Sequence, residues 1–409
     1  MATVLKERLL TTREPDQWPP PPSVMTFTRL AEIEACPRRW ALDSAEYPEV
    51  WNKSGYPPRP NIRAIEGSVI HAAVERIIQE LVKGGCPSLQ QPAAVNALRS
   101  LGGLTAIVTE CIEQMLERFS DNPRLRGLKE FMARSLRAKL PHLRPRVQTL
   151  LASMRLPTLH GIGGRGRYQS RRALSQGAFA EIELRGEQIG WKGKFDLLII
   201  TADACEITDF KTGTPDPNHQ FQMEVYALLW SLDRELNPDA RSVTKLTLAY
   251  SDKDIDVPTL SPDKLEEFQT QVRQRGDAAR LACVTNPPKA LPGIDNCPYC
   301  TVRHLCTEYW TPIVQNEIGA SANSSFVDIE LELTKQHGAT SWDAIVVCSG
   351  FAETGRTILV RSASAEVTFR AGQRLRLLGV NLATDNAPGI EQEPFILHMG
   401  TLTEAFVVV

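Results

Sequence analysis

Asp196, Asp209 and Lys211 are the side chains whose types and spacing best suit chemistry on a phosphate group. One residue separates Asp209 from Lys211 in Asp209-Phe-Lys-Thr-Gly213, and Asp196 ends the earlier segment Gly193-Lys-Phe-Asp196. Alternate residues of a strand share a face, so Asp209 and Lys211 would point the same way. If the two segments pair as a hairpin, Asp196 and Asp209 approach each other across the ladder.

Two close carboxylates repel each other, and a shared Mg²⁺ or Mn²⁺ ion, which prefers hard oxygen ligands, would relieve that repulsion. Such an ion can activate water and stabilise the phosphate during hydrolysis, while Lys211 orients the water or balances the developing charge. Taken alone, however, Asp-x-Lys is more often a surface salt bridge at the end of a strand. The hydrolytic interpretation therefore needs support from other residues.

Four of the nine cysteines suggest a second metal centre. Cys297, Cys300 and Cys306 form a tight cluster, and Cys36 is the best candidate for a fourth partner. An odd cysteine count without a secretory signal argues against a disulfide framework. Thiolates at loop spacing bind Zn²⁺ or an iron–sulfur cluster, and unligated thiols are the third alternative. The remaining cysteines are scattered and are interpreted as small core residues: Cys86, Cys111, Cys205, Cys283 and Cys348.

Positive charge is concentrated in one block. Residues 122–172 hold 11 Arg and 2 Lys against a single acid, Glu130, which leaves about −14 for the rest of a chain whose net charge is −2. A nucleic-acid backbone is the usual anionic partner of such a block. The alternatives are a solvated Arg-rich face or a flexible basic loop. The candidate DNA-binding residues are Arg165, Arg167, Arg171 and Arg172.

The pattern of apolar residues predicts the elements that position these side chains. Apolar spacing predicts a helix over 67–81 that carries His71, after an earlier helix that starts near Thr26 or Thr28. Strands are expected at 180–184, 192–201 and 205–211, with a turn at 202–204. More helix is expected at 90–155, 218–232 and 261–281, with a strand at 246–250. The result is a mixed α/β core with a helical insertion near residues 85–175.

Both ends of the chain differ from this core. Residues 1–23 end in four prolines and are predicted to be a flexible leader, and residues 24–316 would hold the α/β domain. Residues 320–409 contain five or six short strand-like runs, which predict a small all-β barrel that resembles an OB-fold in length and strand rhythm. No apolar run is long enough to cross a bilayer and no signal peptide is evident, so a cytoplasmic location is expected.

Four motifs in order resemble the PD-(D/E)xK nuclease superfamily, in particular the RecB-like branch that includes CRISPR-adaptation exonucleases and AddB-type nucleases. They are Gly67-x-x-x-His71, the Gly193–Asp196 segment, Ile207-Thr-Asp-Phe-Lys-Thr-Gly213 and Gln222-x-x-x-Tyr226. The resemblance covers about residues 24 to 310 and implies a restriction-endonuclease-like core, a mixed sheet flanked by helices.

The resemblance also implies roles for individual residues. His71, Asp196, Asp209 and the carbonyl group of Phe210 would bind the metal, and Lys211 would be catalytic. Gln222 and Tyr226 would complete the catalytic set and help hold the DNA strand. The iron–sulfur members of this branch share the cysteine arrangement, so Cys36, Cys297, Cys300 and Cys306 would hold a [4Fe–4S] cluster that clasps the N-terminal helix to the end of the core.

The function expected from these observations is Mg²⁺- or Mn²⁺-dependent hydrolysis of DNA at single-stranded ends or flaps, in DNA repair or anti-phage defence. The alternative is a catalytically inactive nuclease fold that holds DNA within a larger complex. The chain has no Gly-x-x-x-x-Gly-Lys-Ser/Thr loop. Unwinding would therefore come from a separate helicase or defence-system protein. The barrel could bind a single strand or dock another protein.

Overall fold

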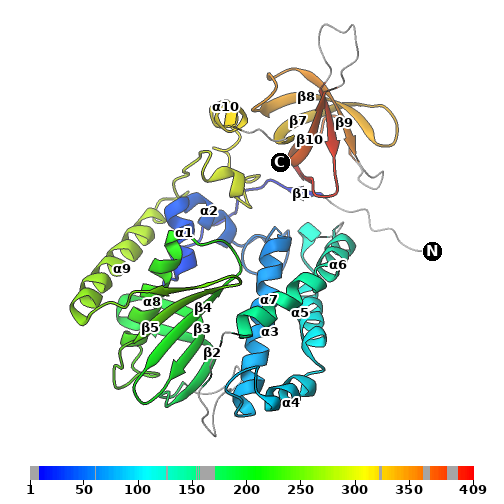
Figure 1. Cartoon of the computed structure of the whole chain (residues 1–409). Helices are drawn as coiled ribbons and strands as arrows, with labels where there is room; N and C mark the ends of the chain where they lie inside the picture. The colour runs from blue at the N-terminus through cyan, green and yellow to red at the C-terminus, as the bar shows by residue number, and fades with distance from the viewer. Residues whose placement is uncertain are drawn as a thin grey trace.

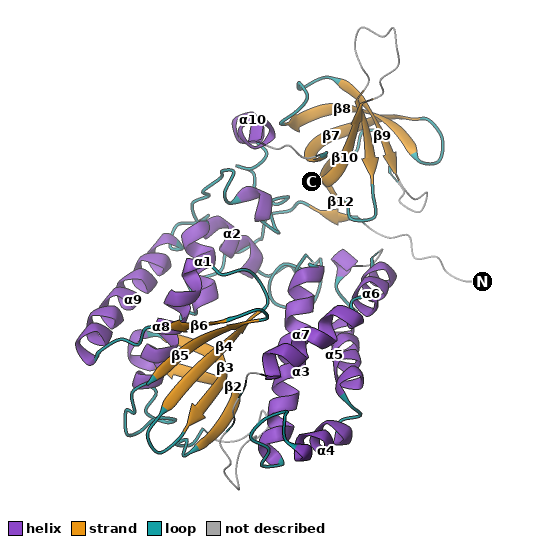
Figure 2. Ribbon diagram, viewed as in Figure 1, coloured by secondary structure: helices purple, strands orange, loops and turns teal. Residues whose placement is uncertain are grey.

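The computed structural model describes residues 9–59, 61–125, 128–152, 154, 156, 171–321, 325–362, 369–384 and 395–409. An α/β body carries a five-stranded sheet, and a second, all-β body lies beyond it (Figure 1). In Figure 2 the orange strands form two separate groups, and the purple helices gather around the larger body. The expected mixed α/β core with a C-terminal barrel is confirmed.

The sheet of the α/β body has the order β2-β3-β4-β5-β6. Its strands are β2 (Gly177–Gly186), β3 (Trp191–Ile200), β4 (Cys205–Lys211), β5 (Lys245–Tyr250) and β6 (Asp254–Val257). Strands β4 and β5 run parallel, and the other neighbouring pairs are antiparallel. The β3–β4 hairpin turns at 201–204, where the Thr201 N–H donates to the Ala204 carbonyl at 2.8 Å. This sheet is the platform on which Asp196 and Asp209 lie.

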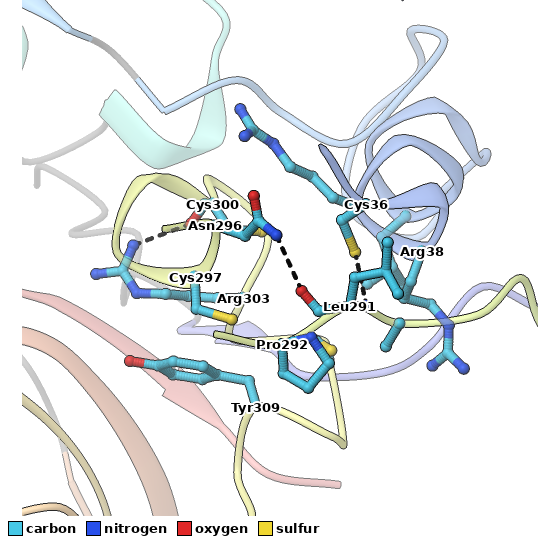
Figure 3. Close-up of a pocket in the computed structure, with 13 residues that line it drawn as sticks. Cys36, Arg38, Leu291, Pro292, Asn296, Cys297, Cys300, Arg303 and Tyr309 are labelled. Carbon is cyan, nitrogen blue, oxygen red and sulfur yellow. Dashed lines mark hydrogen bonds between the residues drawn. The ribbon is translucent and has the colours of Figure 1, made fainter. Parts of the chain in front are cut away.

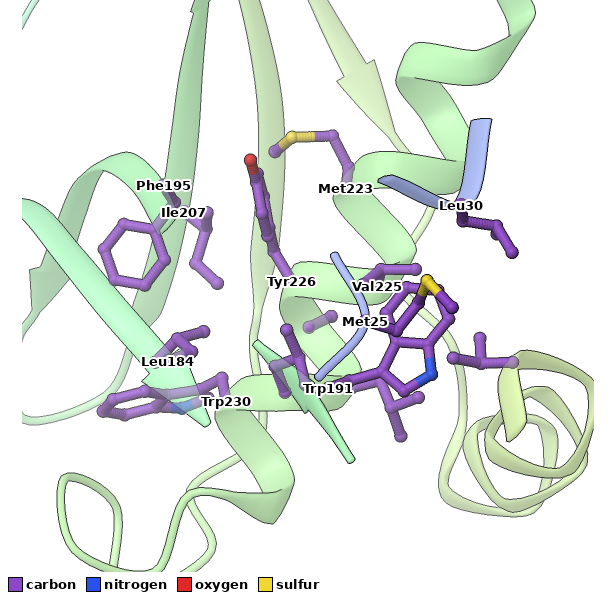
Figure 4. Packing of buried hydrophobic residues seen from close by; sticks show 14 of the residues in the cluster. Met25, Leu30, Leu184, Trp191, Phe195, Ile207, Met223, Val225, Tyr226 and Trp230 are labelled. Atoms are coloured by element: carbon purple, nitrogen blue, oxygen red, sulfur yellow. The ribbon is translucent and has the colours of Figure 1, made fainter. Parts of the chain in front are cut away.

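Helices α1 (Phe27–Ala35), α8 (Pro217–Leu232) and α9 (Pro262–Ala282) cover one face of the sheet. Thr26 caps α1 by accepting from the Arg29 N–H, and Asp216 caps α8 by accepting from the Asn218 N–H. Side chains of α8 pack on Phe195 and Leu184 of the sheet (Figure 4). This buried layer fixes α8, which carries two of the candidate site residues.

The opposite face is covered by α3 (Ile62–Lys83) and by the helices that follow it. These are α4 (Pro92–Ser100), α5 (Leu104–Arg118), α6 (Lys129–Ala138) and α7 (Leu140–Ala152). Successive residues of β3 pack on opposite faces of the sheet. Leu198 packs with residues of α8, and Leu197 packs with residues of α3. Such alternation is expected of a sheet buried on both faces. Segment 90–155 therefore contains several short helices, and α3, which precedes this segment, lies next to the sheet.

Five strands close the C-terminal barrel in the order β7-β8-β9-β11-β10, and β10 pairs again with β7. They are β7 (Phe326–Gln336), β8 (Ser341–Ser349), β9 (Thr357–Ser362), β10 (Arg374–Thr384) and β11 (Phe395–Met399). Strands β9 and β11 run parallel. Helix α10 (Pro312–Ser321) precedes the barrel. One of the strand-like runs expected in residues 320–409, at 366–369, falls largely outside the described residues.

Two short strands extend the barrel sheet at one edge. β12 (Glu404–Val407) pairs with β10, and β1 (Leu10–Thr11) pairs in parallel with β12. Within the leader expected at residues 1–23, backbone pairing holds Leu10 and Thr11 against the barrel. That residues 12–23 are flexible stays a prediction. Residues 1–8 lie outside the described part of the chain. Within that part, every helix is too short or too polar to span a bilayer.

Buried ion pairs connect the barrel to the α/β body. Arg124 donates to both carboxylate oxygens of Glu404, at 2.8 and 2.9 Å, and its side chain is 0% exposed. Arg303 pairs in the same way with Asp328 of β7. Charges this deeply buried are stable only when they are paired. The two bodies therefore share a specific polar interface.

Candidate active site and cysteine pocket

Asp196 and Asp209 face each other across the β3–β4 ladder. The register pairs Leu197 with Thr208, which places the preceding Asp196 opposite the following Asp209. The Phe210 N–H donates to Asp196 Oδ2 at 2.5 Å, and His71 Nδ1 lies 3.1 Å from Asp196 Oδ1. Helix α3 thus delivers His71 to the same edge of the sheet. The hairpin arrangement expected from the sequence brings these groups together.

Asp209 is buried and lies close to charges of both signs. It is 4% exposed, and Lys211 Nζ lies 2.5 Å from its Oδ2 without the alignment of a hydrogen bond. Burial and the negative charge of Asp196 raise the pKa of Asp209 to about 6, although Lys211 opposes the shift. Because a buried carboxylate is costly to ionise, a nearby cation stabilises its charged form. The Asp209–Lys211 pair is therefore buried, unlike a surface salt bridge.

Helix α8 holds Lys211 in place. The Lys211 ammonium donates to Gln222 Oε1 at 2.6 Å, and Gln222 Nε2 donates to the Tyr226 hydroxyl at 2.7 Å. Gln222 and Tyr226 lie at i and i+4 and so share one face of the helix. The ring of Tyr226 packs edge-on against Phe195, with centroids 6.3 Å apart (Figure 4). The two hydrogen bonds that link Lys211 to Gln222 and Gln222 to Tyr226 therefore anchor the lysine to the hydrophobic core.

Two motif glycines are explained by close packing. A Cβ on Gly193 would lie 2.9 Å from Leu229 Cδ1 and 3.0 Å from Tyr226 Cε1. A Cβ on Gly67 would lie 2.9 Å from Thr212 Oγ1. Ordinary carbon contacts begin near ~3.5 Å. Only glycine lets β3 approach α8, and α3 approach the loop after β4, at these distances.

Glu181 on β2 belongs to the same cluster, and the sequence analysis missed it. The register of β2 and β3 places Glu181 opposite Asp196, since their neighbours Ala180 and Ile182 pair with Leu197 and Phe195. Its backbone has a φ of +57°, a left-handed value that is uncommon outside glycine. Glu181 forms an ion pair with Lys194, and burial and Asp196 raise its pKa. A glutamate facing a candidate ligand across a predicted ladder was the available clue.

The geometry suits a metal ion. One ligand atom from each of His71, Glu181 and Asp196 lies within 4.8 Å of the others. Burial lowers the pKa of His71, but the hydrogen bond and charge of Asp196, with the charge of Asp209, leave that pKa raised. Asp209 Oδ2 is buried and lies against the Lys211 ammonium. Clustered carboxylates and an imidazole form a donor set that Mg²⁺ or Mn²⁺ accepts.

An open cavity of about 500 Å³ gives access to these groups. It is lined by every catalytic and metal-binding candidate named from the sequence: His71, Asp196, Asp209, Phe210, Lys211, Gln222 and Tyr226. Because the Phe210 side chain is 2% exposed and packs in the α3 layer, its backbone faces the cavity. Thr212, Thr214, Asp216 and His219 add polar groups to the rim.

The four candidate cysteine ligands line a second cavity (Figure 3). Cys36 lies between α1 and α2 (Pro37–Ser44), Cys297 begins the short helix η3 (Cys297–Tyr299), and Cys300 follows it. The Leu291 N–H donates to Cys36 Sγ, and the Gly293 N–H donates to Cys297 Sγ, each at 3.4 Å. Thiol sulfurs that accept backbone hydrogen bonds are typical of metal-bound thiolates. The donor types therefore fit a sulfur-ligated metal centre, although no three of these four sulfurs lie within 4.8 Å of one another.

Burial keeps the thiols of the cysteine cavity protonated. It raises the pKa of Cys300 to about 11, and it likewise raises the pKa of Cys297 and of Cys306. Metal binding at these thiols would therefore release protons. Arg38 and Arg303 also line the cavity, but each is already paired with a carboxylate, Glu308 and Asp328 respectively.

The basic block is only partly available to a nucleic acid. Arg124 is buried against the barrel, Arg137 pairs with Glu113, and Arg146 donates to the Thr212 carbonyl at 2.6 Å. Each of these three arginines has an internal partner, and DNA contact by the basic block stays a prediction. Arg165 and Arg167 lie outside the described residues.

The two remaining arginine candidates lie just before β2. Arg171 forms ion pairs with Asp233 and Glu235, and it donates to the Glu183 carbonyl at 2.7 Å. These partners already offset its charge. DNA contact by Arg172 stays a prediction.

Comparison with known proteins adds a family match. The family model described as the PD-(D/E)XK nuclease superfamily matches residues 24–307. The chain is similar to the solved structure "Crystal structure of SSO0001" at 19% identity and a TM-score of 0.22, over 33% of this chain and 62% of that one. It is similar to "Crystal structure of p204 HINb domain" at 11% identity and a TM-score of 0.16, over 58% of this chain and 100% of that one.

The chain thus covers 62% of the length of the first of these structures, and both TM-scores are too low to support a structural argument. No curated protein matches the chain. The family match spans the cavity, the motifs and the cysteine cluster.

Proposed function

Since the chain belongs to the PD-(D/E)XK nuclease superfamily, we propose that it is a Mg²⁺- or Mn²⁺-dependent deoxyribonuclease acting on single-stranded ends or flaps. The observation that carries this proposal is the cavity in which Asp196, Asp209 and Lys211 converge with His71. The acidic groups and the lysine are all present, as hydrolysis of a phosphodiester requires. The preference for single-stranded ends or flaps follows from the resemblance to the RecB-like branch.

The residues at the site have distinct roles in this proposal. His71, Glu181, Asp196, Asp209 and the carbonyl of Phe210 would hold the metal. When bound, Mg²⁺ or Mn²⁺ supplies a water of lowered pKa and a positive charge for the phosphate oxygens. The Phe210 N–H fixes the carboxylate plane of Asp196. Each ligand is therefore oriented by the sheet or by α3 before substrate arrives.

Lys211 acts as a fixed cation beside the phosphate. Its ammonium lies between Asp209 and Gln222, so that it stays at the cavity floor and does not extend into solvent. There it would orient the attacking water or neutralise charge that develops on the phosphate. Gln222 and Tyr226 position Lys211 and, in this proposal, help hold the strand.

We further propose that Cys36, Cys297, Cys300 and Cys306 hold a [4Fe–4S] cluster, as in the iron–sulfur members of the RecB-like branch. The shared cavity and the backbone hydrogen bonds to sulfur support a cluster. Ligation would join the start of α2 to the segment after α9, which lie far apart in sequence. The cluster would thus clasp the N-terminal helices to the end of the nuclease core.

Iron and acid-labile sulfide analysis of anaerobically purified protein tests the cluster. We expect about four irons per chain, a brown colour with broad absorbance near about 400 nm, and loss of both in Cys300→Ser. Stoichiometric zinc in a colourless protein would refute the cluster and favour the zinc alternative.

We propose that the C-terminal barrel is an OB-fold. The closed order β7-β8-β9-β11-β10 and the parallel β9–β11 pair support this assignment. DNA repair or anti-phage defence, in the cytoplasm and together with a separate helicase or defence-system protein, is the proposed setting.

A panel of end-labelled oligonucleotides tests the nuclease proposal. Linear single strands, flapped duplexes, blunt duplexes and circular single strands are incubated with Mn²⁺ or Mg²⁺. We expect linear single strands and flaps to be cut and blunt duplexes to survive. Persistent binding without cleavage of any substrate in either metal would instead support an inactive DNA-binding fold.

A further inference from the structure

His219 lines the active-site cavity but has no role in the chemistry described above. It lies in the first turn of α8, where its N–H donates to the Asp216 carbonyl at 3.0 Å. His219, Gln222 and Tyr226 follow at helical spacing, so they share the face of α8 that borders the cavity. One helical turn, about 5 Å, separates His219 from Gln222 along the axis. His219 therefore lies one step beyond the group that holds Lys211.

Tyr250 holds the ring of His219. Its hydroxyl lies 2.7 Å from His219 Nδ1. Tyr250 ends β5 and pairs in register with Lys211 on β4, so the sheet that carries the catalytic lysine also fixes this tyrosine. Tyr250 is 4% exposed. A histidine tied to a buried tyrosine has a defined orientation toward the cavity.

The hydrogen bonding directs one N–H of His219 into the cavity. Burial and the charge of Asp209 raise the pKa of Tyr250, so its phenol keeps the proton at neutral pH. With the phenol as the donor, His219 Nδ1 accepts its proton across the 2.7 Å contact. Burial and the charge of Lys211 lower the pKa of His219, which favours the neutral ring. A neutral imidazole that accepts at Nδ1 carries its proton on Nε2.

Nothing within the described residues uses that second nitrogen. No described side chain or backbone group is hydrogen bonded to His219 Nε2. The carboxylate of Asp216 is the nearest acid on the same helix turn, and it is occupied as the N-cap that accepts from the Asn218 N–H at 2.7 Å. A donor at a cavity wall, one helical turn from the Gln222 that holds Lys211, suits a phosphate oxygen.

We propose that His219 binds the nucleic-acid backbone, donating from Nε2 to a non-bridging oxygen of the phosphate next to the one that is cut. Tyr250 is the positioning residue that fixes the ring. This inference rests on the proposed nuclease function, because it takes the phosphate at Lys211 as the scissile one. The His219 contact would set the register of the nucleic-acid strand in the cavity.

Methylphosphonate scanning tests this contact through binding, without requiring cleavage. A fluorescent single-stranded oligonucleotide and a series with one phosphate replaced by neutral methylphosphonate are titrated by anisotropy in Ca²⁺. The wild-type chain should lose about tenfold in affinity at one position, the size expected for a hydrogen bond to a charged group. His219→Ala should bind the unmodified strand about tenfold more weakly and show no further loss at that position.

Two further variants separate contact from folding. His219→Gln keeps a side-chain N–H donor and should recover part of the sensitivity, whereas Tyr250→Phe should reduce it without removing it. His337→Ala, a histidine of the barrel that pairs with Asp343, is the matched control and should reproduce the wild-type profile. Thermal melting by circular dichroism checks that each variant folds.

The outcomes for the contact and for the enzyme are distinct. A His219→Ala profile that keeps the position-specific loss overturns the phosphate contact, even if the wild-type chain cuts DNA. A position-specific loss that disappears in His219→Ala supports the contact, even if no substrate is cut. Absence of cleavage by the wild-type chain with every metal and substrate would count against the nuclease proposal alone.

Discussion

Gly193→Ala should damage the active site through packing alone. Gly193 lies on β3, three residues before Asp196, and makes no polar contact with the cavity groups. A Cβ at this position would meet Leu229 Cδ1 at 2.9 Å and Tyr226 at 3.0 and 3.1 Å. Both neighbours are buried, at 0% and 5% exposed, so neither can swing into solvent.

The magnitude follows from these distances. Relief of the overlap requires a shift of more than half an ångström in Tyr226 or in β3, and overpacking of this kind costs about 1–3 kcal/mol of folding free energy. Tyr226 would move away from Gln222, with which it shares a 2.7 Å hydrogen bond. Since Gln222 accepts from Lys211, the catalytic ammonium would lose its support. Misplacement of catalytic groups by about 1 Å can lower the rate by up to about 100-fold.

Two measurements separate these effects. Urea unfolding gives the loss of stability, and cleavage of a linear oligonucleotide in Mn²⁺ gives kcat under conditions in which both proteins are fully folded. Gly400→Ala is the matched control, because no heavy atom lies within 4 Å of its added Cβ. We expect the control to stay within about 0.5 kcal/mol of wild type. Unchanged stability and unchanged kcat in Gly193→Ala would refute the packing argument.

Three further predictions concern charge. Glu404→Gln leaves the buried guanidinium of Arg124 without its carboxylate and should lower the free energy of unfolding by about 3–5 kcal/mol, seen in urea titrations; a loss below 1 kcal/mol would contradict a buried pair. In metal-free protein the pKa of Asp209 is raised to about 6 from its ordinary 3.8. The stability this group contributes is fully present below about pH 4 and is lost as the pH rises through 6. Asp209→Asn should therefore be more stable than wild type at pH 8 by up to about 3 kcal/mol, with no gain at pH 4; equal melting temperatures at pH 8 would argue against the shift. Replacing both Arg165 and Arg167 by Glu should weaken single-strand binding and flatten its dependence on salt by about 0.7 in log–log slope per lost contact; an unchanged slope would exclude these arginines from the DNA track.

The local part of the site could be predicted from the sequence. Alternation along a strand placed Asp209 and Lys211 on one face, and the short hairpin turn brought Asp196 opposite Asp209. Helical spacing placed Gln222 and Tyr226 on one face of α8. These inferences succeeded because each depends on a fixed backbone period within a short segment.

Long-range partners could not be predicted in this way. Burial of Arg124 depends on Glu404, which lies 280 residues later in the chain, and no local pattern links the two. Strand β1 forms because β12 offers a free edge, and neither short segment has a strand period of its own. Glu181 has a left-handed backbone conformation, with a φ of +57°, which its sequence does not signal. Net charge over residues 122–172 likewise says nothing about which arginines find internal partners.

The central claim is that Asp209 and Lys211 form the catalytic centre of a metal-dependent deoxyribonuclease. Its most direct test is single-turnover cleavage of a linear single-stranded oligonucleotide by the wild-type chain, Asp209→Asn and Lys211→Ala in Mn²⁺, with binding measured on the same samples. We expect EDTA to stop the wild-type reaction and each substitution to lower the rate at least about 100-fold, a loss of about 2.7 kcal/mol in transition-state stabilisation, with affinity kept within a few fold. Cleavage at wild-type rates by both variants would contradict the assignment of the site.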